Sequence, residues 1–124
     1  MNYSRSDADK ARGAATPAAA PPTVAVIVPC FNEEAGIGAV VRGVRATLPA
    51  ARVYVIDNAS QDLTAVTAAE AGATVITETA RGKGNAVRRA FAEIDADVYV
   101  MLDGDGTYDV AAAPAMIEKI GRAH

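Results

Sequence analysis

The sequence has very few of the residues that usually build disulfide frameworks and zinc sites. It contains one cysteine, Cys30, and one histidine, His124, which is the last residue. A lone cysteine excludes an internal disulfide and a cysteine-based zinc site, and a terminal histidine excludes an internal histidine dyad. Carboxylates are therefore the side chains that remain for metal binding or acid–base chemistry.

Long hydrophobic runs are also missing. The longest unbroken, strongly apolar run is Val24 to Val28, whereas a membrane-spanning helix needs about 18 residues or more. The first residues have no apolar core of the kind that signal peptides carry. We therefore expect no transmembrane segment and a cytoplasmic location.

The chain is short and slightly acidic. Its 124 residues provide room for one domain, and a hydrophobic content of 51% is enough for a packed core. The formal net charge of −3 at pH 7 argues against a nucleic-acid partner held by a basic surface.

The residue pattern changes after an Ala/Pro-rich start. Residues 1–22 show no periodic apolar face and are predicted to form a disordered tail, and residues 23–124 are predicted to form the domain. Strands are expected at Val24 to Val28, Arg52 to Ile56, Thr74 to Thr77 and Val98 to Leu102. A first helix is expected after Asn32, which would be its cap, and a second from Asp62 to Ala71. A third helix would present an apolar face of Val87, Ala90, Phe91 and Ile94, and a fourth is expected from Ala111 to Gly121. This alternation predicts an α/β fold, a Rossmann-like parallel sheet with helices on both faces.

Polar residues follow each expected strand. Ligands of such sheets bind beyond the carboxyl ends of the strands. In this sequence those ends carry Asn32 and Glu33, Asp57, Glu78 and Lys83, and Asp103 and Asp105. The sequence therefore predicts one ligand site at one edge of the sheet, with a layout that suits a nucleoside diphosphate and a divalent ion.

The pair Asp103 and Asp105 is the candidate metal site. Two carboxylates on a glycine turn can face one Mg²⁺ or Mn²⁺ ion, whose remaining ligands are water and phosphate. Asp and Gly are also common turn residues, so the spacing alone leaves both interpretations open. A calcium loop does not fit, because Tyr108 and Pro114 stand where glycine and glutamate are required.

The other polar positions also have two interpretations. Gly82-Lys83-Gly84, at the start of a helix, could approach a pyrophosphate or form only a solvated loop. Asp57 could bind a base or ribose, or cap the next turn. Asn32 and Glu33 could serve only as helix caps.

Four ordered motifs give the sequence a specific resemblance over about Thr23 to Gly121. The motifs are Val26 to Glu34, Val55 to Asp62, Gly82 to Arg88 and Leu102 to Asp109. In this order they resemble the motifs of family 2 glycosyltransferases, most of all the branch of dolichyl- and polyprenyl-phosphate mannosyl- or glucosyltransferases.

The resemblance implies the amino-terminal half of a GT-A fold, which binds a nucleotide-sugar donor, here a UDP- or GDP-sugar. By this likeness Pro29, Asn32 and Glu33 line the nucleoside pocket. Asp57 holds the base or the ribose, and Lys83 lies near the diphosphate.

The same likeness makes Asp103 and Asp105 the DxD element. Asp103 contacts the donor and the metal, and Asp105 is the more direct ligand of Mn²⁺ or Mg²⁺. The ion would neutralise the diphosphate leaving group in an inverting sugar transfer. Thr107 stands where many relatives have glutamine.

Relatives of this family normally continue well beyond the length of this chain. We therefore expect a domain that is incomplete at its C-terminus, with the catalytic base, and hence the catalytic residues, outside it. The implied acceptor is a polyprenyl phosphate, which needs no base, and the implied location extends to the cytoplasmic face of a membrane. The strand Val98 to Leu102 is expected to have an open edge that favours homo-association.

Three rival interpretations remain. A degenerate, non-catalytic nucleotide-binding fragment would carry the same motifs. A sugar-phosphate nucleotidyltransferase needs a glycine-rich loop after the first strand, where Pro29-Cys30-Phe31-Asn32 stands. A receiver domain needs a phospho-accepting aspartate after the third strand, where Thr77-Glu78 stands.

Overall fold

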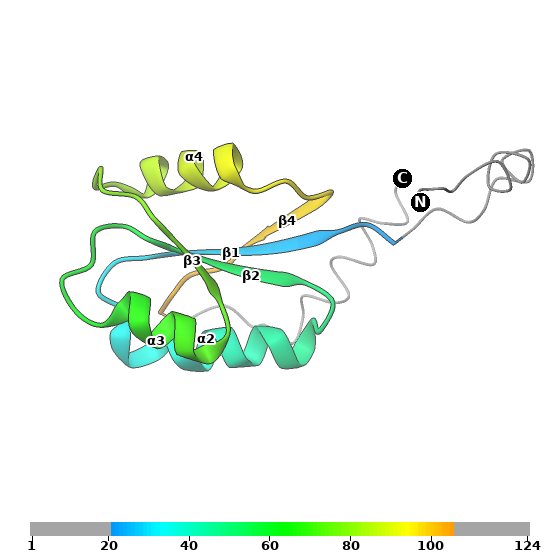
Figure 1. Cartoon of the computed structure of the whole chain (residues 1–124), viewed down its shortest axis with the longest axis horizontal. Coiled ribbons are helices and arrows are strands. Elements are labelled where there is room, and N and C mark those ends of the chain that lie inside the picture. Colours follow the sequence, from blue (N-terminus) through cyan, green and yellow to red (C-terminus); the bar gives the residue numbers. More distant parts are fainter. Residues whose placement is uncertain (1–20, 106–124) are drawn as a thin grey trace, which may run out of the picture.

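A four-stranded parallel sheet with helices on both faces forms the centre of the computed structural model, which describes residues 21–105 (Figure 1). The strand order is β3-β2-β1-β4, and every pairing is parallel. This confirms the predicted α/β class. The elements in chain order are β1 (Val24–Cys30), α2 (Glu34–Thr47), β2 (Arg52–Asp57), α3 (Thr64–Ala71), β3 (Thr74–Thr77), α4 (Lys83–Glu93) and β4 (Val98–Met101).

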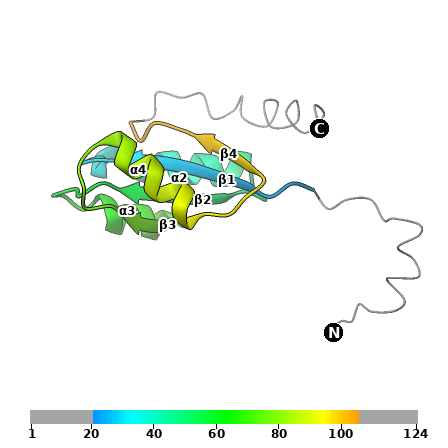
Figure 2. The same cartoon turned by 90° about the horizontal axis from the view of Figure 1, so that it is seen from above.

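The alternation of side chains along β1 divides the core into two layers. Val26 and Val28 pack with the buried residues of α2 and α3, whereas Ala25 and Ile27 pack with those of α4. All four side chains are at most 1% exposed. Because both faces of β1 are covered, its sequence is a continuous apolar run rather than an alternating one. Figure 2 shows the same layering from above, with α4 crossing in front of the sheet.

Strand β1 continues two residues past its predicted end, through Pro29 to Cys30. The carbonyl of Ile27 accepts a hydrogen bond from the Leu102 N–H on the β4 side. Since backbone groups alternate in direction along a strand, the nitrogen of Pro29 faces that same side, where the β1–β4 register has ended at Ile27↔Met101. A proline is tolerated there because no ladder hydrogen bond is lost.

The predicted cap of α2 is wrong. The helix begins at Glu34 with Glu33 as its N-cap. Asn32 instead adopts a left-handed backbone conformation, with φ of 54°. Its side-chain oxygen accepts a hydrogen bond from the Gln61 N–H at 2.8 Å. A contact distant in sequence therefore replaces the local cap.

The predicted apolar face of α4 is only half right. Ala90 and Ile94 are buried, but they are joined by Ala86 rather than by Phe91. Phe91 is 51% exposed and lies edge-on to Tyr99, with ring centroids 4.9 Å apart. The small side chains of Ala86 and Ala90 face the sheet, so the bulky ring is left at the rim of the helix.

Strand β4 forms the outer edge of the sheet among the described residues. Within residues 21–105 it pairs with β1 alone, and both the open edge and homo-association through it stay predictions. The predicted helix from Ala111 to Gly121 and residues 1–20 of the predicted tail lie outside the described residues. In the part that the structure covers, no helix is long and apolar enough to cross a membrane.

Replacing either of two glycines by alanine should change the stability of the fold, with opposite sign for the two. One glycine lies within α2 and the other directly follows α3. Gly72, which ends α3, has φ of +110°, and an added Cβ would lie 2.4 Å from Nη1 of Arg45. We expect Gly72→Ala to destabilise the fold by ~1–2 kcal/mol, measured by urea unfolding. Gly43, inside α2, has no atom within 4 Å of an added Cβ, so Gly43→Ala should stabilise it by ~1 kcal/mol. Shifts of the same sign in both variants would contradict this account.

Candidate functional site

The carboxyl ends of the strands surround a cavity of about 280 Å³. Its walls come from the end of β1, the residue after β2, the loop that leads into α4 and the turn that follows β4. The lining residues are Pro29, Cys30, Phe31, Glu33, Asn58, Arg81, Gly82, Lys83, Asp103, Gly104 and Asp105. The predicted edge of the sheet therefore does carry a hollow.

Five of the seven predicted site residues line this cavity: Pro29, Glu33, Lys83, Asp103 and Asp105. Asn32 and Asp57 do not. Asp57 is 8% exposed, and its Oδ1 accepts a hydrogen bond from the Ser60 N–H at 3.1 Å. Together with the Asn32–Gln61 bond, this contact shapes the loop between β2 and α3 beside the cavity.

The turn carrying Asp103 and Asp105 is packed tightly against the end of β1. A Cβ added at Gly104 would lie 2.7 Å from Sγ of Cys30 and 3.3 Å from Cγ of Glu33. Only glycine allows this approach without displacement of a neighbour. The middle residue of the motif therefore fixes where the two flanking carboxylates stand.

Opposite charges meet at the mouth of the cavity. The Lys83 ammonium lies 3.2 Å from Oδ1 of Asp103, and the two side chains are 66% and 56% exposed. An ion pair this exposed contributes at most about 1 kcal/mol. The Lys83 ammonium can therefore turn to a ligand at small cost.

Negative charge is concentrated on the β1 side of the cavity. Burial raises the pKa of the Glu33 carboxyl, and the nearby carboxylates of Asp105, Asp62 and Asp103 raise this pKa further. A carboxyl that is harder to ionise because of its acidic neighbours indicates a field that attracts a cation.

The residues present fit a divalent cation that is shared with a ligand. Asp103 and Asp105 are exposed on one turn and offer the hard carboxylate oxygens that Mg²⁺ and Mn²⁺ prefer. Within residues 21–105, no cluster of three or more histidine, cysteine or acidic side chains forms a complete metal cage. Two carboxylates suit an ion that takes its other ligands from water and phosphates.

Sequence reasoning gave no role in the site to four lining residues: Cys30, Phe31, Asn58 and Arg81. The Arg81 guanidinium carbon lies 3.6 Å from the centroid of the Phe31 ring, a cation–π contact across the cavity wall. Asn58 lies buried at the end of β2. The Phe31–Arg81 contact joins loops fifty residues apart in sequence, and no local spacing signals it.

Comparison with known proteins gives a consistent result. Residues 25–124 match the family described as Glycosyl transferase family 2. Protein RfbJ of Shigella flexneri is 50% identical over 97 residues, which cover 78% of this chain and 75% of RfbJ. Glycosyltransferase AglJ of Haloferax volcanii is 40% identical over 101 residues, 81% of this chain and 33% of AglJ.

A solved structure shares the fold. Glucosyl-3-phosphoglycerate synthase from Mycobacterium tuberculosis, crystallised with Mn²⁺, UDP and glucosyl-3-phosphoglycerate, aligns with a TM-score of 0.72 and 26% identity. The alignment covers 80% of this chain and 39% of the synthase. The chain thus spans three quarters of RfbJ but only about a third of AglJ and two fifths of the synthase.

The contact between Gly104 and Cys30 can be tested by a double-mutant cycle. Gly104→Ala should lower the free energy of unfolding by ~1–3 kcal/mol, because the new methyl group overlaps with Sγ. In a Cys30→Ala background, which removes Sγ, the same substitution should cost clearly less. Equal costs in both backgrounds, measured by urea unfolding, would show that this contact does not position the turn.

The Cys30 thiol should be inert in the folded protein. Burial, aided by the charges of Glu33, Asp57 and Asp62, raises its pKa to about 12. At pH 8 only a fraction of about 10⁻⁴ would be thiolate, against roughly a quarter for an ordinary thiol of pKa 8.5. We expect alkylation by iodoacetamide at pH 8 to be over about 100-fold slower in the native chain than in urea. Comparable native and unfolded rates would contradict this burial.

Proposed function

The chain belongs to glycosyl transferase family 2, and on that basis we propose that its cavity binds the nucleotide of a nucleotide-sugar donor together with a divalent cation. The observation that carries the proposal is the Asp103–Asp105 turn, which Gly104 holds against the end of β1. This contact directs two carboxylates to the cavity that Lys83 also lines. At about 280 Å³, the cavity is near the lower limit of small-ligand pockets, a size that suits part of a donor.

The diphosphate is proposed to lie between the 103–105 turn and the start of α4. Asp103 and Asp105 would hold Mn²⁺ or Mg²⁺, which when bound would neutralise the charge of the diphosphate leaving group. Lys83 would turn from Asp103 to a phosphate oxygen, exchanging one exposed ion pair for another. The N-terminal end of α4, which has partial positive charge, would add to this attraction.

The nucleoside is proposed to lie against the β1 side of the cavity. Pro29 and Glu33 line this wall, and the Phe31–Arg81 pair offers a flat surface beside it. Asn32 and Asp57 would act on the same subsite by shaping the loop between β2 and α3.

We propose UDP as the nucleotide, since the synthase that shares the fold was crystallised with UDP and Mn²⁺. The wider reaction, inverting transfer of the sugar to a polyprenyl phosphate in the cytoplasm or at the cytoplasmic face of a membrane, is proposed from the resemblance of the four motifs. A phosphate oxygen is already nucleophilic, so such an acceptor requires no general base from the described residues.

Calorimetric titration of the chain with UDP and GDP, with and without Mn²⁺, tests donor binding. We expect Mn²⁺-dependent binding of UDP, weakened about tenfold or more by Asp105→Asn, because one of two metal-facing carboxylates is lost. Glu70→Gln, which neutralises an exposed carboxylate on α3, is the matched control and should bind like the wild type. A folded chain that binds neither nucleotide, or binds UDP equally well without metal, would refute the proposal.

A further inference from the structure

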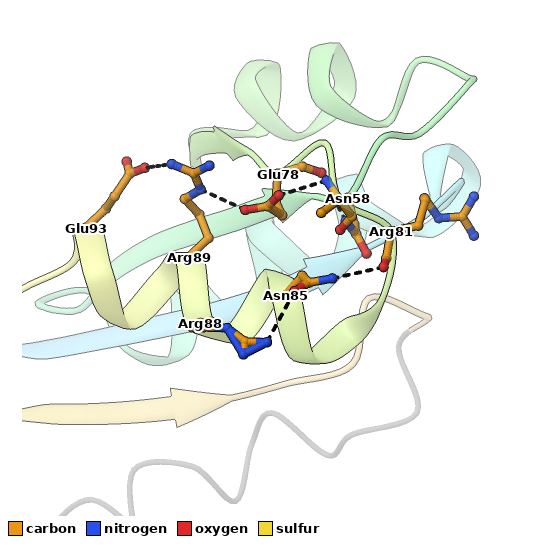
Figure 3. Close-up of polar contacts among 8 residues, drawn as sticks. Asn58, Glu78, Arg81, Asn85, Arg88, Arg89 and Glu93 are labelled. Carbon is orange, nitrogen blue, oxygen red and sulfur yellow. Dashed lines mark hydrogen bonds and ion pairs between the residues drawn. The ribbon is translucent and has the colours of Figure 1, made fainter.

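The buried side chain of Asn58 holds the loop between β3 and α4. This residue is 6% exposed, and its backbone N–H donates to the Cys30 carbonyl at 2.8 Å. Its Nδ2 donates to the carbonyls of Glu78 at 3.0 Å and Ala80 at 2.9 Å, and its Oδ1 accepts from the Gly82 N–H at 2.9 Å. Figure 3 shows this amide beside the loop. One side chain therefore joins the end of β2 to three residues of the loop.

A second clamp acts from within the loop. The Glu78 carboxylate accepts from the Ala80 N–H at 2.8 Å and from Nε of Arg89 at 2.9 Å. Arg89 also pairs with Glu93 on the same helix (Figure 3). The Ala80 N–H and Arg89 lower the pKa of Glu78, so this carboxylate is charged at neutral pH. The loop is thus tied to the body of α4 as well as to β2.

These clamps determine where the cationic wall of the cavity stands. Arg81 and Lys83 flank Gly82, whose N–H donates to Oδ1 of Asn58. Gly82 is the N-cap residue of α4 and has a φ of +127°. The carbonyl of Arg81 is in turn held by Nδ2 of Asn85 at 3.1 Å. If the Asn58 contacts are lost, the strand ladder holds this loop only at its first residue, where the Glu78 N–H donates to the Asp57 carbonyl, because β3 ends at Thr77.

We propose that Asn58 is a positioning residue for the diphosphate side of the site, acting through the 78–82 loop on Arg81, Lys83 and the first turn of α4. The proposal rests on the proposed function. The chemistry requires an amide, because the position needs two donors and one acceptor at once. Aspartate has the same shape, but it would place a carboxylate oxygen where Nδ2 now donates to two carbonyls. Because a carboxylate oxygen cannot donate, both hydrogen bonds would be replaced by repulsion between oxygens.

The experiment compares Asn58→Ala and Asn58→Asp with the wild type, using UDP and uridine as probes in the presence of Mn²⁺. Uridine lacks the diphosphate, so a positioning role predicts that UDP affinity falls about tenfold while uridine affinity is unchanged. The Mn²⁺ dependence of UDP binding should remain, because the 103–105 turn is held by Cys30 and not by the loop. Ala46→Glu adds a charge at an exposed position of α2, away from the cavity, and serves as the charge control.

A readout without nucleotide tests the clamp itself. Exchange of the Gly82 amide hydrogen should be slow in the wild type and about tenfold or more faster in both Asn58 variants. Unchanged exchange, unchanged UDP affinity, or an equal loss for UDP and uridine would each overturn the proposal. A wild-type chain that binds no UDP would instead remove the proposed function, and the positioning role with it.

A second variant covers the case in which the Asn58 variants do not fold. Glu78→Ala removes the second clamp, which holds only Ala80 of the loop, and the Glu78 side chain is 11% exposed. We expect Glu78→Ala to lower UDP affinity by about threefold, less than the Asn58 variants do, and to leave uridine affinity unchanged. No loss of UDP affinity in this variant would overturn the proposal.

Discussion

The geometry of the site depends on one close contact, the packing of the 103–105 turn against the end of β1. Parallel pairing of β4 with β1 brings this turn next to Cys30, and the missing side chain of Gly104 lets the two backbones meet. The contact is apolar and buried on one side, while the flanking aspartates are exposed on the other. A rigid core contact thereby positions two exposed carboxylates at the cavity.

The opposite wall of the cavity is built by a different means. The strand ladder reaches the 78–82 loop only at Glu78, whose N–H donates to the Asp57 carbonyl at 3.0 Å. Beyond it, hydrogen bonds from the buried side chains of Asn58 and Glu78 hold the loop. Such a network is stable only when each buried polar group is paired, because an unpaired amide or carboxylate away from water is costly. The loop is accordingly defined by a few specific side chains rather than by general packing.

The two walls carry opposite charge, and this matches a ligand that is both anionic and metal-bound. On the β1 side, burial and then the nearby carboxylates raise the pKa of Glu33, whereas Arg81 and Lys83 stand on the loop side. The exposed pair between Lys83 and Asp103 bridges them and costs little to open. Membership of a family of glycosyl transferases agrees with a cavity of this kind.

The sequence by itself determined the parallel α/β fold, the family, and the gathering of polar residues at one edge of the sheet. Hydrophobic periodicity and strand–helix alternation are local signals, and topology then forces the carboxyl ends of parallel strands together. Tertiary structure alone decided that Asn32 does not cap α2, that Phe91 lies at the rim of α4, and that Asn58 clamps a loop some twenty residues away. These outcomes depend on contacts between distant segments, whose energies no local pattern of residues encodes.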